Sequence, residues 1–263
     1  MSAIILDGSM VHYEALGRGR PIIFLHGWVG SWRYWINAMQ VASTSFRAYA
    51  IDLFGFGDST RDPLRYSLEK QAELINRFLE EMGIGKVAIV GHDLGALVGF
   101  AFLKKWHTSV DRMMVINCPV EYDALNARMK NATMPELIDW LSSKTPEATS
   151  ALADAAKADP KAVTASIDSL QADNLFPNVR NLGVPCLFVY GSTTPAMTVP
   201  TQEKADTLLP MHMHQINLDG LGHFPMIDNP PQFNRLLTDF LALDSGESPR
   251  ELQLKEEWKR RVR

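Results

Sequence analysis

The chain has 263 residues, of which 46% are hydrophobic and 21% charged, and its formal net charge is −4. These values are ordinary for a globular protein with a substantial buried core, and they give no reason to expect nucleic acid or an anionic membrane as a partner. No apolar run approaches the roughly 18 residues that would span a bilayer. The first residues lack a basic segment followed by a long apolar one, so we expect no signal peptide and a cytoplasmic protein.

Strand and helix patterns alternate over the first 119 residues. Residues 3–13 predict a hairpin closed by Asp7-Gly8-Ser9. Residues 32–39 and 67–82 have helical period. Four short apolar runs predict buried strands: residues 21–25, 46–53, 87–90 and 112–118. This alternation predicts a mostly parallel sheet with helices on both faces and functional side chains at the carboxyl ends of the strands.

The character of the chain changes after the sixth predicted strand. Residues 120–181 show no strand pattern, and alanine-rich helical segments alternate with breaks at Pro135, Pro146, Pro160 and Pro177. We expect a helical insertion rather than a separate domain. Strands resume at 184–190 and 212–218, and helices are predicted from about 201 and over 231–243. Residues 245–263 form a charged tail, which we interpret as an amphipathic helix that packs Leu252, Leu254 and Trp258 on the body.

One stretch carries the strongest functional pattern. Val87 to Val90 is a β-branched run, Gly91 and Gly95 bracket Asp93, and an apolar helical pattern follows. Strand, sharp turn and helix form the context of a nucleophile elbow, G-x-Nuc-x-G, whose glycines allow a close approach of the two backbones. The central position needs a residue that tolerates positive φ, which aspartate does better than most.

With this elbow, the sequence resembles the α/β-hydrolase fold superfamily, in particular the branch with an aspartate nucleophile: haloalkane dehalogenases, fluoroacetate dehalogenases and epoxide hydrolases. The resemblance implies an α/β-hydrolase core over residues 1–119 and 182–244, a helical lid over 120–181 and the tail over 245–263. Four motifs in the family's order carry it: His26-Gly27-Trp28, Asp52-Leu53-Phe54-Gly55-Phe56-Gly57-Asp58-Ser59, Gly91-His92-Asp93-Leu94-Gly95 and Gly222-His223-Phe224-Pro225.

The resemblance also implies a mechanism. Asp93 attacks a carbon of a small apolar epoxide or organohalide and forms an alkyl ester, and His223 activates the water that hydrolyses it. The backbone N–H groups of Trp28 and Leu94 form the oxyanion hole. We expect no cofactor and no metal site, since His212 and His214 share a strand face without a third ligand pattern.

The third member of the triad is left open by the sequence. The usual acid position, in the loop after residues 184–190, holds Thr194. The alternative acid position matches about Asn117, and Glu121 and Asp123 follow within one turn. Glu121 is our candidate acid, with Asp123 second, and an incomplete triad in which Asn117 or Thr194 orients His223 is the alternative.

Other departures keep further functions open. Leu94 follows the nucleophile, where the dehalogenases have Trp or Arg, and Tyr122 is the one tyrosine between 120 and 181, where epoxide hydrolases use two. Ester or lactone hydrolysis with Asp93 as general base is one alternative, and a non-catalytic ligand-binding protein is another. A homodimer also stays open. Cys118 and Cys186 are predicted to be buried free thiols.

Overall fold

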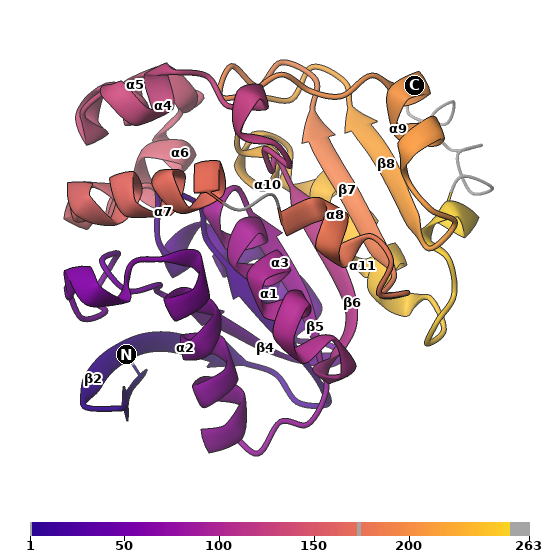
Figure 1. Ribbon diagram of the computed structural model, residues 1–263, viewed down its shortest axis with the longest axis horizontal. Helices are drawn as coiled ribbons and strands as arrows, with labels where there is room; N and C mark the ends of the chain where they lie inside the picture. Colours follow the sequence, from indigo (N-terminus) through magenta and orange to yellow (C-terminus); the bar gives the residue numbers. More distant parts are fainter. Residues whose placement is uncertain (1, 173–174, 253–263) are drawn as a thin grey trace.

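The strands form one twisted, mostly parallel sheet. The computed structural model describes residues 2–172 and 175–252, and their eight-stranded sheet has the order β1-β2-β4-β3-β5-β6-β7-β8 (Figure 1). β2 pairs antiparallel with β1 and β4, and all other pairs are parallel, as predicted. The strands are β1 (Ser2–Leu6), β2 (Ser9–Leu16), β3 (Arg20–Leu25), β4 (Phe46–Ile51), β5 (Val87–His92), β6 (Val110–Ile116), β7 (Cys186–Gly191) and β8 (Met213–Leu218).

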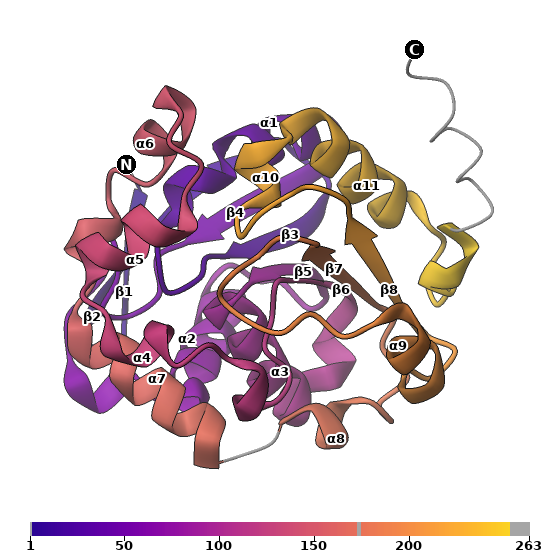
Figure 2. The ribbon, with the colours of Figure 1, turned by 90° about the horizontal axis from the view of Figure 1, so that it is seen from above.

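Helices cover both faces of this sheet. Seen from above, α1, α10 and α11 lie on one face, and α2, α3 and α8 lie on the other (Figure 2). Because both faces are covered, apolar strands such as β5 are buried at every residue. The helices outside the insertion are α1 (Ile36–Ala42), α2 (Leu68–Glu81), α3 (Leu94–Trp106), α9 (Gln202–Leu208), α10 (Pro225–Asp228) and α11 (Pro230–Ala242), with 3-10 turns η1 (Trp32–Trp35), η2 (Pro63–Arg65) and η3 (His107–Ser109).

Local sequence signals set several of these boundaries. Asp7 and Gly8 adopt φ of +47° and +76°, the geometry of a two-residue hairpin turn that matches the strand twist. The Ser67 side chain accepts the N–H of Lys70 and so caps α2. Gly83 follows that helix with φ +65°. Both predicted ends of this helix are therefore confirmed.

The described part of residues 120–181 is helical and contains no named strand. Its helices α4 to α7 gather at the end of the sheet toward which the strand arrows point (Figure 1). α8 differs, because it packs along α3, and the Phe176 ring contacts those of Phe100 and Phe188. The end of the predicted insertion is thus part of the core packing. The elements are η4 (Tyr122–Ala124), α4 (Arg128–Asn131), α5 (Met134–Leu141), α6 (Pro146–Ala151), η5 (Ala155–Lys157), α7 (Pro160–Ala172) and α8 (Leu175–Val179).

Three other predictions concern the cysteines, membrane-spanning helices and the C-terminal tail. Cys118 and Cys186 are buried free cysteines, as predicted. Within residues 2–172 and 175–252, no helix has the length and apolar character needed to cross a bilayer. Leu252 is buried, whereas Leu254 and Trp258, predicted to pack beside it, lie outside the described residues.

Candidate active site

Asp93 occupies a strained turn between β5 and α3. Its φ is +55° and its ψ −115°, a region that non-glycine residues seldom adopt. A Cβ on Gly91 would lie 2.7 Å from the backbone nitrogen of Ala96, and one on Gly95 would lie 2.2 Å from the carbonyl oxygen of Leu25. Both positions therefore require glycine. The predicted strand–turn–helix elbow is confirmed, and it places the Asp93 side chain at the carboxyl end of the central strands.

A buried histidine faces this carboxylate. His223 Nε2 lies 3.3 Å from Asp93 Oδ2, and the two residues are 0% and 1% exposed. Burial raises the pKa of Asp93 to about 7 and lowers that of His223 to about 3, because a charge is poorly solvated in this interior. His223 is therefore neutral, and the contact is a hydrogen bond rather than an ion pair.

The two predicted oxyanion-hole residues lie beside Asp93. The backbone N–H of Trp28 donates to the Asp93 carboxylate and opposes the rise of its pKa. Leu94 is the first residue of α3, where a backbone N–H has no acceptor within its own helix. The backbone of Gly27 also lies close to the Asp93 side chain, since a Cβ at this position would lie 3.1 Å from Asp93 Oδ2.

Thr194 faces the second ring nitrogen of His223. Its Oγ1 lies 3.1 Å from His223 Nδ1, and the residue is 8% exposed. Glu121, our candidate acid, is not brought to this nitrogen: it is exposed and precedes η4 in an extended conformation. Asp123 is exposed as well. The physical reason is hydration, since both carboxylates keep water contact on the surface instead of entering the buried site.

Asn117 fixes the loop that carries His223 rather than the imidazole ring. It follows β6 with φ +42°. Its Nδ2 donates to the carbonyl oxygens of His223 and Gly222 at 2.8 and 3.2 Å, and its Oδ1 accepts the N–H of Gly191 at 2.9 Å. Asn117 thus ties the ends of β6 and β7 to the histidine loop.

A second set of hydrogen bonds braces the same loop, and the sequence did not indicate it. Tyr34 Oη accepts the N–H of Gly27 at 2.6 Å and donates to His92 Nδ1 at 2.9 Å. His92 Nε2 in turn donates to the carbonyl oxygen of His223 at 2.8 Å. Burial lowers the pKa of His92 to about 3, so the ring is neutral and its tautomer is set by these partners.

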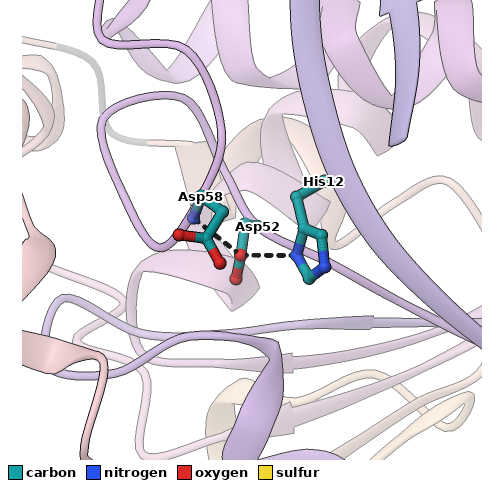
Figure 3. A group of neighbouring side chains, drawn as sticks. All are labelled: His12, Asp52 and Asp58. Carbon is teal, nitrogen blue, oxygen red and sulfur yellow. Dashed lines mark hydrogen bonds and ion pairs between the residues drawn. The ribbon is translucent and has the colours of Figure 1, made fainter. Parts of the chain in front are cut away.

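Another buried histidine–aspartate pair joins β2 to the loop after β4 (Figure 3). His12 Nδ1 lies 2.8 Å from Asp52 Oδ2, which also accepts the N–H of Asp58, while Asp52 Oδ1 accepts the N–H of Trp32. Ligand atoms of His12, Asp52 and Asp58 lie within 4.8 Å of one another. Since N–H groups already occupy both Asp52 oxygens, this arrangement holds the loop and does not resemble a metal site.

A groove of about 1100 Å³ lies between the insertion and the core. It reaches Tyr34 and His223, whereas Asp93 is not among the residues that line it. The groove thus borders one side of the loop that carries His223, whereas the Asp93 carboxylate is enclosed by protein. The other lining residues include Arg33, Asn37, Ser142, Ser143, Thr145, Glu147, Thr193 and Asp228.

Comparisons with known proteins agree with this architecture. A model of the alpha/beta hydrolase fold matches residues 20–142. The soluble epoxide hydrolase of Corynebacterium sp. (strain C12) is 31% identical over 113 residues, a match that covers 43% of this chain and only 40% of that enzyme. The 2-hydroxy-6-oxo-6-(2'-aminophenyl)hexa-2,4-dienoic acid hydrolase of Metapseudomonas resinovorans is 24% identical over 89% of this chain and 88% of its own. The enol-lactonase of Burkholderia xenovorans LB400 superimposes with a TM-score of 0.79 at 17% identity, covering 92% of this chain and 100% of that structure.

Proposed function

We propose that this chain, which has the α/β-hydrolase fold, is a hydrolase that acts through a covalent ester on Asp93. The observation that carries the proposal is the surroundings of this carboxylate: it lies at the centre of the elbow, accepts the N–H of Trp28 and faces His223 Nε2 at 3.3 Å. The substrate class is a small apolar epoxide or organohalide. Partial relatives named as epoxide hydrolases support that class.

The first step uses Asp93 as the nucleophile. One carboxylate oxygen attacks the substrate carbon, a C–O ester bond forms, and the bond to the epoxide oxygen or the halide breaks with its electron pair. The N–H of Trp28 holds the other carboxylate oxygen and orients the attack. Burial favours this step, because a carboxylate with few hydrogen-bond donors is more reactive than a hydrated one.

The second step regenerates the carboxylate. A water molecule gives a proton to His223 Nε2, and the resulting hydroxide adds to the carboxyl carbon of the Asp93 ester. The N–H groups of Trp28 and Leu94 stabilise the negative oxygen of that tetrahedral intermediate. Collapse releases the alcohol, which takes the proton back from His223. The second proton of the water, left on the Asp93 carboxyl group, passes to the alkoxide formed from the epoxide, or to solvent when the leaving group is a halide, and this restores the carboxylate. Thr194 orients the imidazole through Nδ1 but supplies no negative charge to an imidazolium, so this step is expected to be slow.

A second candidate function is favoured by the raised pKa of Asp93. A carboxyl group with a pKa of about 7 is well matched to general-base catalysis near neutral pH. Asp93 could then deprotonate a water that attacks an ester or lactone carbonyl directly, without a covalent intermediate. The hydrolase of Metapseudomonas resinovorans, matched over most of both chains, supports hydrolysis of a carbonyl compound.

Isotope labelling separates the two candidates. The protein is run for many turnovers on an epoxide, a haloalkane and an ester in ¹⁸O-water, digested, and the peptide that contains Asp93 is weighed. Ester formation places ¹⁸O in this carboxylate, whereas general-base catalysis leaves it unlabelled. His223→Gln is expected to accumulate the alkyl ester as a mass increase on the same peptide. His107→Gln, at an exposed histidine, is the matched control and accumulates none.

A further inference from the structure

Trp28 connects the candidate active site to the helical insertion. Its backbone N–H donates to the Asp93 carboxylate, and its indole Nε1–H donates to Ser166 Oγ at 2.7 Å, across 138 residues of sequence. Ser166 lies in α7. One residue thus touches the nucleophile with its main chain and the insertion with its side chain.

The contact between Trp28 and Ser166 is fully enclosed. Trp28 is 0% exposed and Ser166 1% exposed. Ser166 Oγ also lies 2.8 Å from the carbonyl oxygen of Ala162 and 2.9 Å from that of Val163, so its hydroxyl donates within α7 while its oxygen accepts from the indole. Because both residues are buried, the serine oxygen is the partner that satisfies this N–H.

The segment just before α7, residues 154–159, is bound to core residues near the site. Asp154 pairs with Arg33 at 2.7 Å, and Lys157 with Asp58 at 2.8 Å. The hydroxyl of Tyr66 donates to Asp159 at 2.7 Å. Arg33 and Trp28 belong to the same stretch after β3, so the docking of this segment and the position of Trp28 are mechanically linked. Figure 1 shows α7 lying against the core above α2.

We propose that Ser166 is a positioning residue that fixes the Trp28 N–H on Asp93 when α7 is docked on the core. With α7 docked, the indole is anchored and the main-chain N–H points at the carboxylate. Without the serine oxygen, the indole turns or admits water, and the N–H loses its fixed direction. The catalytic consequence of this coupling depends on the proposed function, whereas the coupling itself does not.

The structural test compares two serines of one helix. Ser166→Ala removes the acceptor of the indole. Ser169→Ala is the matched control, because Ser169 Oγ donates to the carbonyl oxygen of Ala165 within the same helix. Indole N–H exchange is followed by NMR, with the Trp28 signal assigned from Trp28→Phe. Exchange at Trp28 is expected to accelerate about tenfold or more in Ser166→Ala and to stay unchanged in Ser169→Ala. Ser166→Thr keeps a hydroxyl and is expected to preserve the protection.

The second readout is the titration of Asp93, observed through its side-chain carboxyl carbon. Loss of the Trp28 N–H is expected to raise the midpoint in Ser166→Ala above that of the unmodified protein, because that N–H stabilises the carboxylate. The other groups that face or influence Asp93 are His92, His223, Tyr34 and Cys118, and they are the same in both serine variants. A Trp28 exchange rate in Ser166→Ala equal to that of the unmodified protein would overturn the proposal, and so would an unchanged Asp93 midpoint.

Activity gives the third readout and separates the two proposals. If Asp93 becomes labelled with ¹⁸O, kcat of Ser166→Ala is expected to fall about tenfold with little change in KM, and Ser169→Ala to match the unmodified protein. If Asp93 takes up no label, the ester mechanism fails, while the exchange and titration results still decide whether Ser166 positions Trp28.

Discussion

Within residues 2–172 and 175–252, two buried histidine–aspartate hydrogen bonds have similar geometry but different surroundings. His12 and Asp52 lie 2.8 Å apart, and Asp52 accepts two further backbone N–H groups. His223 and Asp93 lie 3.3 Å apart, and Asp93 accepts one backbone N–H, from Trp28. The two aspartates are equally buried, at 0% and 1% exposure.

The histidines of the two pairs also differ in pKa. At His12 the hydrogen bond to Asp52 outweighs burial and raises the pKa of the imidazole. At the second pair, burial dominates: the pKa of Asp93 rises to about 7 and that of His223 falls to about 3. A well-satisfied carboxylate stabilises a loop, whereas a poorly satisfied one is available for chemistry. The comparison indicates that the pair available for chemistry is the one whose carboxylate accepts fewer backbone N–H groups.

Asp93→Asn is expected to show the largest effect. It removes the nucleophile, or the base of the alternative mechanism, and lowers kcat about 10³-fold or more. Stability is expected to hold or to increase, because a buried carboxylate with a single N–H donor is replaced by a neutral group. Initial rates and thermal unfolding measure both, with intact mass confirming the asparagine. A marked loss of stability would show that Asp93 has the structural role we assign to Asp52.

Asp52→Asn is expected to have the opposite pattern: it lowers stability and leaves the activity of the folded protein nearly unchanged. The new amide nitrogen must face one of the N–H groups of Trp32, Asp58 or His12, so a buried donor loses its acceptor, and unfolding is expected to become easier by about 3 kcal/mol. Urea denaturation measures this change. The rate per folded molecule is expected to stay within a few-fold at low temperature. A folded, stable variant without activity would instead place Asp52 in the reaction.

Local patterns were sufficient for the parts of the site that depend on backbone sterics. The elbow could be predicted because the approach of β5 to α3 at Gly91 and Gly95 excludes a Cβ. The place of Thr194 opposite His223 was implied by the family resemblance, which puts the usual acid in the loop after residues 184–190, and the 3.1 Å contact agrees. The alternation of strands and helices was enough to predict the sheet and its covered faces.

Contacts between segments distant in the sequence could not be predicted in this way. Tyr34 contacts His92 across 58 residues, and Trp28 contacts Ser166 across 138. Each contact depends on how two distant segments pack in the folded chain, and this packing leaves no periodicity in the sequence. Glu121 was favoured because it follows β6 closely along the chain, yet the backbone carries it to the surface. Sequence proximity was a poor guide once Asn117 had turned the chain at positive φ.

Thr194→Asp is expected to add the carboxylate that the Asp93–His223 pair lacks and so to complete a catalytic triad. A carboxylate opposite Nδ1 holds the proton there, leaves Nε2 free to accept a proton from water, and stabilises the imidazolium that forms. Hydrolysis of the Asp93 ester in single turnovers is expected to accelerate about tenfold or more. Thr194→Asn has the same shape without the charge and is the control. Equal rates in the two variants would mean that His223 does not act as the base of this step.

The smallest expected effect is the pH dependence of the His12–Asp52 pair. Since the pKa of His12 is raised above 6.5 in the folded state, its contribution to stability is fully present below pH 6.5 and is lost as the pH rises through the folded-state pKa. Asp93 contributes in a lower pH range. Its folded-state pKa of about 7 exceeds the ordinary 3.8, so its contribution to the free energy of unfolding falls as the pH rises between those values. Asp93→Asn removes the second contribution. In that background, the free energy of unfolding is expected to rise with pH up to about 6.5, because the folded-state pKa values of His92 and His223 lie near 3, and to fall above it. Adding His12→Gln is expected to remove the fall above pH 6.5. If the free energy of unfolding still falls above pH 6.5 in the double variant, a group other than His12 titrates in this range, and the His12–Asp52 pair does not cause the pH dependence.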